Sequence, residues 1–487
     1  MEAKQPILLN ESNRKKLFGT YDGESENIDR LKQYYFKSDI YESLISDQPL
    51  KILIGNKGVG KSAMFKVAYA EAKEKGFMAI NLVPDDVAEI WEKQDEIDII
   101  KVRKWKHALT ENIAKRVLQE LDLFDPNISN TIVSLGHKIF TILAKSIESI
   151  KQSQTLSSKQ TTRIDNFLAS KEIVVYLDDI DRNWQNRKES VKIITTLIAA
   201  MRSLANDNPG LSFKLALRLD VYRAVRASDE SADKWEDALV YLSYKVHDIF
   251  VFLIKRILTF YGEKIDDSKI MKTSQNALAQ NLKPVFEPTF QGKGKWKDVE
   301  MKTVLTSLIR NRPRDLVKLC AESAKEAFKN GESVIKTEHI LAILPKYSES
   351  IIDDTIGEYG SELSQIDKLL YGMKPSKKEK SAEDAFKYTT KQLHDKLFNI
   401  MQNTNFKFAS GAAMTNRALK DFLYKINFIT ARKGDENGKI IRFNYEENQK
   451  LSLPYMEEHY EWEVHLAYRW ILTPDSIDEV FKKISLQ

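Results

Sequence analysis

The clearest chemistry in this chain lies in a glycine-rich segment. The segment runs Gly55-Asn56-Lys57-Gly58-Val59-Gly60-Lys61-Ser62 and matches the pattern G-x-x-x-x-G-K-[ST]. Its glycines let successive backbone N–H groups turn inward around phosphate oxygens, at dihedral angles that a Cβ would resist. In this pattern Lys61 reaches the β- and γ-phosphate oxygens, and the Ser62 hydroxyl binds Mg²⁺. With Ala63, these residues form the predicted nucleotide-binding set.

The alternative is a chance match in a glycine-containing turn, and the flanking elements decide between the two. An apolar strand is predicted at Leu50–Ile54, directly before the loop. The helix after it has Met64, Phe65, Val67, Ala68 and Ala72 on one face and ends at Gly76, and Phe77–Val83 is predicted to be a second strand. Strand, phosphate loop, helix and strand in this order indicate a parallel α/β sheet. The sequence therefore predicts a P-loop NTPase domain that takes ATP and Mg²⁺.

A second set of polar residues follows another predicted strand. The buried-type run Glu172–Leu177 leads directly into Asp178-Asp179-Ile180-Asp181-Arg182. A P-loop needs a carboxylate at the end of a neighbouring strand to hold the Mg²⁺ ion. Asp178 is placed for that role, and Asp179 is the candidate that polarises the attacking water. The alternative is a helix N-cap followed by solvated acids.

Two arginines are candidates for sensing the γ-phosphate. Arg218 ends the predicted strand Phe213–Leu219, where it would lie beside the phosphate; an ion pair with Asp220 or the aspartate cluster is an equal alternative. Arg312-Pro313-Arg314-Asp315 opens a helix. The proline and the aspartate suit a helix start, but cations there are unfavourable unless an anion is near. A γ-phosphate reached from a second domain would supply that anion, with Arg314 as the contact.

These segments resemble a known family. The ILIGNKGVGKS loop, the VVYLDDIDR strand end, the LALRLDVYR strand and the RPRDLVKLC helix are similar to those of bacterial STAND/KAP-like P-loop ATPases, over roughly residues 18–350. The helical part also resembles the lid of origin-recognition AAA+ proteins. The resemblance implies that Lys61 and Ser62 bind phosphate and Mg²⁺, that Asp178 and Asp179 are the Walker B acids, that Arg218 is sensor-1-like and that Arg314 is sensor-2-like. The AAA+ sensor 1 is usually asparagine, so Arg218 favours the STAND side. Proteins of this type often act as nucleotide switches in signalling or antiviral defence.

The chain is long enough for about three domains. We expect a P-loop domain at 1–260 with a helical elaboration at about 100–168, a helical lid at 261–371, and a winged-helix-like domain at 385–487. In the lid, helices are predicted at Met301–Arg310, Asp315–Lys329 and Thr337–Leu344. A linker is predicted at 372–384, where proline and clustered charge replace large apolar residues.

Composition excludes some classes of site. Cys320 is the single cysteine among 487 residues, so an intramolecular disulfide and a thiolate zinc site are excluded. The net charge of +5 results from 75 basic and 70 acidic residues. It does not by itself indicate that the protein binds nucleic acid. No signal peptide and no run of about 20 apolar residues is present, so we expect a cytoplasmic protein without a membrane partner.

Residues 385–445 follow a winged-helix pattern of two helices and a hairpin. The helix Thr415–Ile426 precedes strands at Phe428–Ala431 and Lys439–Phe443. The basic residues expected to be exposed and available to DNA phosphates are Arg417, Lys420, Lys425, Arg432, Lys433 and Arg442. A protein-binding or regulatory winged helix is the alternative. His459 and His465 fit neither a single helix face nor HExxH, so we expect no metal there.

Three functions are compatible with these features. The first is an ATPase switch, in which ATP closes the sheet domain against the lid and hydrolysis reopens it. Such a switch would form a homo-oligomer and control a separate effector protein. The second is an ATP-gated DNA-binding regulator acting through the C-terminal winged helix. The third, a small-molecule kinase, is weaker because no acceptor pocket can be identified.

Overall fold

The computed structural model describes residues 5–21, 23, 25–84, 86, 98–123, 138–153, 156–181, 184, 188–228, 235–376, 379, 385–434, 440–453, 455–457 and 459–473. The chain divides into two compact units. One is Asn27–Leu242, called the P-loop unit below. The other joins Met1–Glu26 to Ser243–Gln487 and is called the helical unit.

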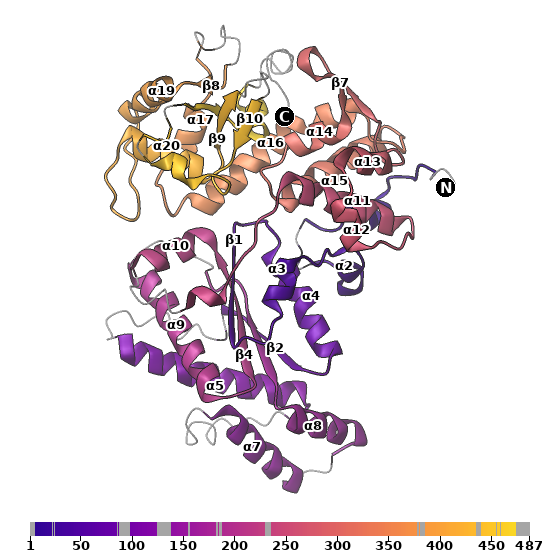
Figure 1. Cartoon of the computed structure of the whole chain (residues 1–487), viewed down its shortest axis with the longest axis vertical. Helices are drawn as coiled ribbons and strands as arrows, with labels where there is room; N and C mark the ends of the chain where they lie inside the picture. The colour runs from indigo at the N-terminus through magenta and orange to yellow at the C-terminus, as the bar shows by residue number, and fades with distance from the viewer. Residues whose placement is uncertain are drawn as a thin grey trace. The chain divides into compact units, whose positions relative to one another are not determined.

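A parallel sheet forms the centre of the P-loop unit (Figure 1). Its strands are β1 (Leu50–Gly55), β2 (Met78–Leu82), β3 (Ile173–Leu177), β4 (Leu211–Arg218) and β5 (Leu239–Tyr241), in the order β2-β3-β4-β1-β5. All neighbouring pairs are parallel, as their apolar runs predict. Because β4 lies between β1 and β3, the carboxyl end of β4 lies between the glycine-rich loop and the aspartates. This sheet confirms the predicted P-loop NTPase fold.

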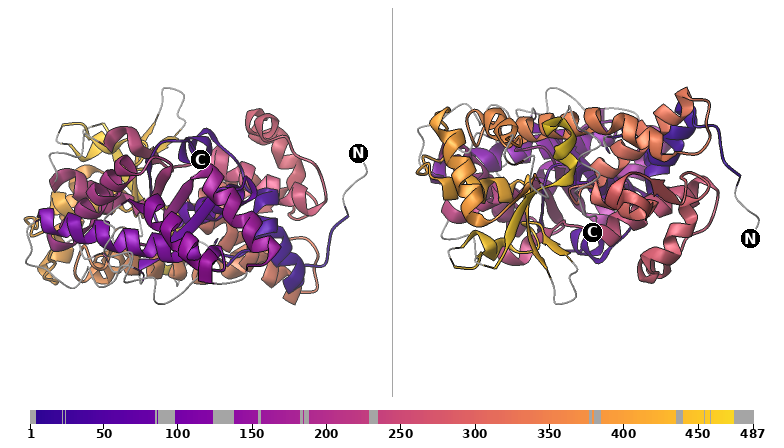
Figure 2. Two further views of the ribbon diagram at one scale, coloured as in Figure 1. Left: turned by 90° about the horizontal axis from the view of Figure 1, so that it is seen from below. Right: turned by 90° about the horizontal axis from the view of Figure 1, so that it is seen from above.

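Helices cover both faces of this sheet. They are α2 (Ile28–Tyr34), α3 (Asp39–Leu44), α4 (Lys61–Glu74), α5 (Asp98–Glu120), α7 (Ile139–Ser153), α8 (Ser158–Ser170), α9 (Lys188–Asp207) and α10 (Leu219–Ser228). Helix α4 packs on one face, while α5 and α9 pack together on the other (Figures 1 and 2). The predicted apolar face of α5 is confirmed, since Trp105, Leu109, Ile113 and Val117 are buried there. Residues 124–137 and 154–155 of the predicted helical elaboration lie outside the described part of the chain.

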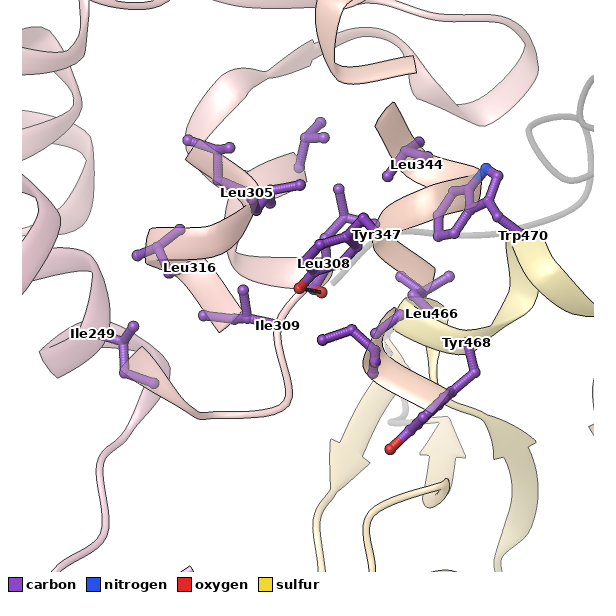
Figure 3. Close-up of a cluster of buried hydrophobic side chains, with 14 of the residues drawn as sticks. Ile249, Leu305, Leu308, Ile309, Leu316, Leu344, Tyr347, Leu466, Tyr468 and Trp470 are labelled. Atoms are coloured by element: carbon purple, nitrogen blue, oxygen red, sulfur yellow. Dashed lines mark hydrogen bonds between the residues drawn. The ribbon is translucent and has the colours of Figure 1, made fainter. Parts of the chain in front are cut away.

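The helical unit is built around one apolar core, part of which Figure 3 shows. Its helices are α1 (Glu11–Phe18), α11 (Val246–Phe260), α12 (Asp267–Lys272), α13 (Gln275–Ala279), α14 (Met301–Ser307), α15 (Pro313–Lys329), α16 (Thr337–Tyr359), α17 (Ile366–Gly372), α19 (Thr390–Gln402), α20 (Asn416–Lys425) and α21 (Leu466–Leu472). Its short 3₁₀ turns are η4 (Gln280–Leu282), η5 (Gly294–Trp296) and η6 (Gln449–Ser452), and β6 (Thr289–Gln291) pairs with β7 (Lys297–Glu300).

Two segments of the helical unit differ from the expected bounds. Helix α16 continues to Tyr359, although the predicted helix ends at Leu344; it passes through Pro345, whose ring is normally unfavourable inside a helix. Buried Ile351 and Ile352 on the continuation stabilise it by packing in the core. Helix α1 packs on α11 and α15, because Leu17 and Phe18 are buried there. The N-terminal residues therefore belong to this unit, whereas the sequence places them with the P-loop domain.

The last part of the chain contains a four-stranded antiparallel sheet. Its strands are β8 (Lys387–Tyr388), β9 (Ile429–Gly434), β10 (Ile440–Phe443) and β11 (Glu461–Val464), in the order β10-β9-β11-β8. The expected helices and the β9–β10 pair are present, but the hairpin turn at 435–439 lies outside the described residues. The sequence did not predict β11, which lies between β9 and β8. A winged helix is therefore not established here.

Within the described residues, no helix is both long and apolar enough to cross a membrane.

Candidate nucleotide-binding site

The glycine-rich loop joins the end of β1 to the start of α4, and each of its three glycines has its own geometric reason. A Cβ on Gly55 would lie 2.8 Å from Val59 Cγ1 and 2.9 Å from the Leu242 carbonyl oxygen, so no larger residue fits. Gly58 has a φ of 76° and Gly60 a φ of 105°, in the region that side chains resist. Gly60 is also the N-cap of α4. The loop therefore has the conformation that its sequence pattern predicts.

Lys61 is held by the backbone of the same loop. Its Nζ donates to the carbonyl oxygen of Gly55 at 2.9 Å and to that of Asn56 at 3.3 Å. Lys61 is also the first residue of α4, so its backbone lies at the positive end of the helix dipole. The helix N-terminus provides a fixed positive charge at the loop, and the lysine side chain provides a mobile one. Both favour a bound phosphate group. Val59 is buried and packs the loop, whereas Lys57 is exposed.

Asp178 and Ser62, the predicted metal ligands, are brought together. The Ser62 hydroxyl hydrogen-bonds the Asp178 carboxylate, whose Oδ1 also accepts the Asp179 N–H at 2.9 Å. Burial raises the pKa of Asp178 above its ordinary value, although the Ser62 hydrogen bond and the Lys61 charge oppose the shift. A hydroxyl oxygen beside a poorly solvated carboxylate is a suitable donor pair for a hard cation such as Mg²⁺. The donor set thus fits the predicted ion.

Asp179 has an unusual backbone conformation. Its φ is 58°, in the left-handed region that aspartate tolerates better than most non-glycine residues. Its side chain is partly exposed, in contrast to Ile180 and Asp181, which are buried. The assignment of Asp179 as the water-polarising acid stays a prediction.

Asp181 is a site residue that the sequence reasoning did not single out. Its Oδ2 accepts the backbone N–H of Arg218 at 2.6 Å, which joins the turn after β3 to the end of β4. Burial raises the pKa of Asp181 to about 6, and the Lys61 charge opposes that shift. The third acid of the Asp-Asp-Ile-Asp segment was the available signal. Arg182, the next residue of the segment, lies outside the described part of the chain.

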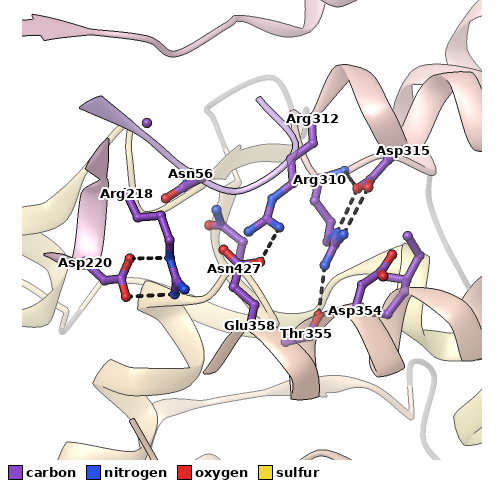
Figure 4. A network of polar contacts seen from close by, with 12 residues as sticks. Asn56, Arg218, Asp220, Arg310, Arg312, Asp315, Asp354, Thr355, Glu358 and Asn427 are labelled. Carbon is purple, nitrogen blue, oxygen red and sulfur yellow. Dashed lines mark hydrogen bonds and ion pairs between the residues drawn. The ribbon is translucent and has the colours of Figure 1, made fainter. Parts of the chain in front are cut away.

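Arg218 lies next to the loop and is ion-paired. It is the register partner of Gly55 on the neighbouring strand. Its Nε and Nη2 donate to the two carboxylate oxygens of Asp220 at 3.1 Å and 2.8 Å, as Figure 4 shows. The ion pair that the sequence offered as an alternative is therefore present. It holds the guanidinium at the carboxyl edge of the sheet, where the sensor role stays a prediction.

The arginines at the start of α15 are balanced within the helical unit. Arg312 donates through Nη1 to Glu358 Oε2 at 2.8 Å, and both side chains are buried (Figure 4). Arg314 donates through Nε to the Tyr21 carbonyl oxygen at 3.0 Å. The sequence argument that these cations need an external anion is thus wrong for Arg312, because Glu358 on α16 supplies one. Sequence alone could not pair two residues so far apart.

The expected basic surface of the C-terminal segment is largely neutralised. Lys420 is fully buried and pairs with Glu457, and Arg432 and Arg442 both contact the buried carboxylate of Glu463. Lys425 pairs with Glu362, and Arg417 lies 3.7 Å from Asp421. Lys433 is exposed and lies over the Tyr460 ring. The prediction that this set is exposed is therefore wrong for Lys420 and Arg432.

The two histidines near β11 do not lie in a metal site of the described residues. His465 is the N-cap of α21, where its Nδ1 accepts the Ala467 N–H at 3.2 Å. Burial lowers the pKa of His465 to about 3, so the ring is neutral at physiological pH. His459 is exposed.

Comparison with known proteins gives remote structural likenesses only. No family model and no curated protein matches the chain. Solved structures that resemble it include a Walker-type ATPase of Pyrococcus abyssi, at 13% identity and a TM-score of 0.39, covering 90% of this chain and 97% of that one. The Aeropyrum pernix Orc1 protein in complex with DNA matches at 12% identity and a TM-score of 0.36, covering 95% of this chain and 96% of that one. These TM-scores are too low to support an argument about this chain. The P-loop fold is instead established by the strand order and the loop geometry of the chain itself.

Proposed function

We propose that this protein is a Mg²⁺-dependent ATPase that acts as a nucleotide switch. The observation that carries the proposal is the convergence of the Gly55–Ser62 loop, the Ser62–Asp178 hydrogen bond and Arg218 at the carboxyl edge of one parallel sheet. In open parallel α/β sheets, ligands bind at that edge. Buried acids with raised pKa values are also typical of functional sites.

Each residue has one role in this proposal. The loop N–H groups and Lys61 bind the phosphates, and Ser62 with Asp178 holds Mg²⁺, which neutralises charge on the β- and γ-phosphate oxygens when it is bound. Asp179 accepts a proton from the attacking water. Arg218, oriented by Asp220, stabilises negative charge that develops on the γ-phosphoryl group.

The switch itself involves the helical unit. Arg314 at the start of α15 is the proposed residue that responds to the γ-phosphate, and its present partner is the Tyr21 carbonyl. Its release from that carbonyl would couple nucleotide binding to the N-terminal segment. The resemblance to STAND/KAP-like ATPases supports homo-oligomerisation and control of a separate effector in bacterial antiviral defence.

Phosphate release under multiple-turnover conditions with Mg-ATP tests the enzymatic claim. We expect Lys61→Ala and Asp179→Asn each to lower kcat by about 10²-fold or more, since each removes a group that acts mainly in the transition state. Asp179→Asn should retain ATP binding, because it leaves the phosphate loop intact. Lys145→Ala, an exposed lysine on α7, serves as the matched control. An inactive wild type that still binds ATP tightly would overturn the ATPase assignment.

The alternative, an ATP-gated DNA-binding regulator, has less support. Acidic partners occupy most of the basic residues that it requires, and Lys433 is the exposed exception. Retention of duplex DNA by the full chain, falling steeply with salt and weakened by Lys433→Glu, would favour this function.

A further inference from the structure

A cavity lies at the end of the central sheet opposite to the phosphate loop. Its volume is about 470 Å³, within the range of small-molecule sites. It is bounded by the segment after α3, by the last turns of α4 and by the first residues of β3 and β4. All of these elements belong to the P-loop unit.

A buried lysine lies in the floor of this cavity. Lys214 of β4 is 3% exposed, and its Nζ donates to the carbonyl oxygens of Ser46 at 2.8 Å and Gln48 at 3.4 Å. No carboxylate of the described residues forms an ion pair with it. An ammonium group buried without a counter-charge costs several kcal/mol. Lys214 is therefore a site where a bound anion would be favourable.

A second lysine increases the positive charge beneath the cavity. Lys51 of β1 is the register partner of Lys214 and is also buried, with its Nζ donating to the Asp237 carbonyl at 3.3 Å. Burial, together with the Lys51 charge, lowers the pKa of Lys214 to about 8, although Asp47 opposes the shift.

The acidic groups of the cavity are placed differently. Glu71 on the wall already accepts from Tyr41 Oη at 2.7 Å and pairs with Lys37 at 2.7 Å. Asp47 and Glu172 are exposed residues that line the cavity, where water screens them. The acidic groups around the cavity are thus neutralised by a partner or by water, whereas the buried ammonium group of Lys214 is not.

The remaining lining is aromatic and aliphatic. Tyr176, Phe77 and Tyr41 supply rings, and Val174 and Ile45 supply branched aliphatic side chains. Tyr176 is fixed by edge contacts with Phe65 at 5.5 Å and Tyr69 at 5.9 Å between ring centroids. A flat apolar ligand body suits such walls, and a carboxylate suits the floor.

We propose that this cavity binds a small aromatic carboxylate, whose acid group pairs with Lys214 and whose ring lies against Tyr176 and Phe77. The site is separate from the nucleotide site but shares its elements. Alternation along β4 places Lys214 on the same face as Arg218, and alternation along β3 places Tyr176 on the same face as Asp178. Helix α4, which begins with Lys61 and Ser62, lines the cavity with Ala68, Glu71 and Ala72.

Through these shared elements the ligand would regulate the nucleotide site. This regulatory role rests on the proposed ATPase function. A ligand that orders β4 and the end of α4 would change the freedom of Arg218 and of the phosphate loop. The coupling passes through two strands and one helix that both sites share, which is the kind of contiguous packing that can carry it.

Fluorine NMR of the full chain tests the binding directly. The probe is 4-fluorobenzoate, compared with the neutral 4-fluorobenzamide and the cationic 4-fluorobenzamidine. We expect wild type to bind the benzoate at least about tenfold more tightly than either isostere, the ratio that about 1.4 kcal/mol of charge pairing gives. Preference for the amidine, or equal binding of all three, would overturn the assignment.

Two variants locate the site. Lys214→Met keeps an unbranched side chain of similar length and removes the charge, and Ser212→Leu fills the cavity from β4 while Lys214 remains. Both should abolish the benzoate preference, whereas Lys145→Met, at an exposed position of α7 that does not line the cavity, should retain it. Unchanged benzoate binding in Ser212→Leu that is folded, as judged by circular dichroism, would overturn the location even if Lys214→Met fails to fold.

Phosphate release with and without saturating 4-fluorobenzoate then separates binding from coupling. A change of at least twofold in wild type, absent in Ser212→Leu, is expected. Binding without any change in an active wild type would overturn the coupling. A wild type that binds the probe but hydrolyses no ATP would instead contradict the proposed function.

Discussion

The carboxyl edge of the parallel sheet and the start of α15 both bury charge, but they treat it in opposite ways. At the sheet edge, burial raises the pKa values of Asp178 and Asp181. At α15, burial alone would also raise the pKa of Asp315, but the Arg310 guanidinium reverses the shift and holds the pKa below its ordinary value. At the sheet edge the ionised form of the acids is destabilised by burial. At α15 an arginine stabilises the ionised form of the buried acid.

Geometry explains the difference. Arg310 donates to both oxygens of Asp315 at 2.8 Å and 3.0 Å, and its Nη1 also donates to Thr355 at 2.9 Å (Figure 4). The same Nη1 donates to the Tyr468 hydroxyl at 3.1 Å. This network joins α15, α16 and α21 and leaves the guanidinium well satisfied. The acids at the sheet edge have hydroxyl and backbone donors and the distributed charge of Lys61. Buried charge that is poorly compensated by its own protein is typical of a binding site, whereas a closed network is typical of structure.

The largest effect is expected from opening the closed network. Asp315→Ala leaves Arg310 buried without its carboxylate and should cost about 3–5 kcal/mol of the free energy of unfolding. Hydrogen exchange of α15 peptides, compared with peptides of β3, measures the loss in the helical unit separately from the P-loop unit. The pair Arg310→Met with Asp315→Leu is the control, and it should cost much less than the single change. A loss below about 1 kcal/mol in the single variant would contradict the contrast.

The next effect depends on pH and on Asp181. Its folded pKa of about 6 lies above the ordinary 3.8, so the folded state binds the proton more tightly, and stability falls as pH rises from about 4 to 6. Asp181→Asn removes this fall, and at pH 7 it should gain up to about 3 kcal/mol relative to wild type, at about 1.4 kcal/mol per pKa unit.

Urea unfolding at pH 4.5 and pH 7.5 checks the change, with the difference expected to shrink at the lower pH. Asp315 gives the opposite sign, because its stabilisation is present above pH 3.8 and is lost as pH falls through its lowered pKa. An Asp181→Asn gain that is the same at both pH values would contradict the pKa assignment.

Asp178→Asn should separate stability from function. The partly buried carboxylate, whose pKa is raised, is destabilising in the protein without Mg²⁺, so its removal should leave the free energy of unfolding unchanged or raise it by about 1 kcal/mol. The same variant should lose the stabilisation that Mg-ATP gives to wild type. Thermal unfolding with ATP, with and without Mg²⁺, measures both effects. A large loss of stability without nucleotide would place Asp178 with the structural acids.

The smallest effect is expected at an exposed pair. Arg163 lies 2.9 Å from Asp122 on the surface of the P-loop unit. Arg163→Met should change the free energy of unfolding by less than about 1 kcal/mol, since water screens the pair. If this change lowered the free energy of unfolding as much as Asp315→Ala does, burial would not explain the different effects of the two ion pairs.

Sequence reasoning was most successful where chemistry is local. The spacing of Gly55, Gly58 and Gly60 predicted both the fold of the loop and its place between β1 and α4, because the loop conformation is determined within a few residues. It was less successful where partners are distant. Glu358 lies 46 residues from Arg312, and no local pattern reveals that the two form a buried pair.

The C-terminal sheet shows the same limit. Helices and a hairpin were visible in the pattern, but β11 pairs between two strands from earlier in the chain, and short segments carry little signal about their neighbours. Lys420 and Arg432 are buried because acidic side chains pair with them. Glu457 pairs with Lys420, and Glu463 of β11 pairs with Arg432. The expectation that the basic residues of this segment are all exposed therefore overstated its basic surface.

The division of the chain also has a consequence for synthesis on the ribosome. Helix α1 emerges before the P-loop unit, but its packing partners α11 and α15 lie beyond residue 242. The intervening P-loop unit is continuous and can fold as soon as it emerges. The leading segment must therefore wait, with the apolar side chains of Leu17 and Phe18 uncovered, until more than two hundred further residues have been translated. A chaperone that binds nascent apolar segments would have a defined period in which to act on this protein.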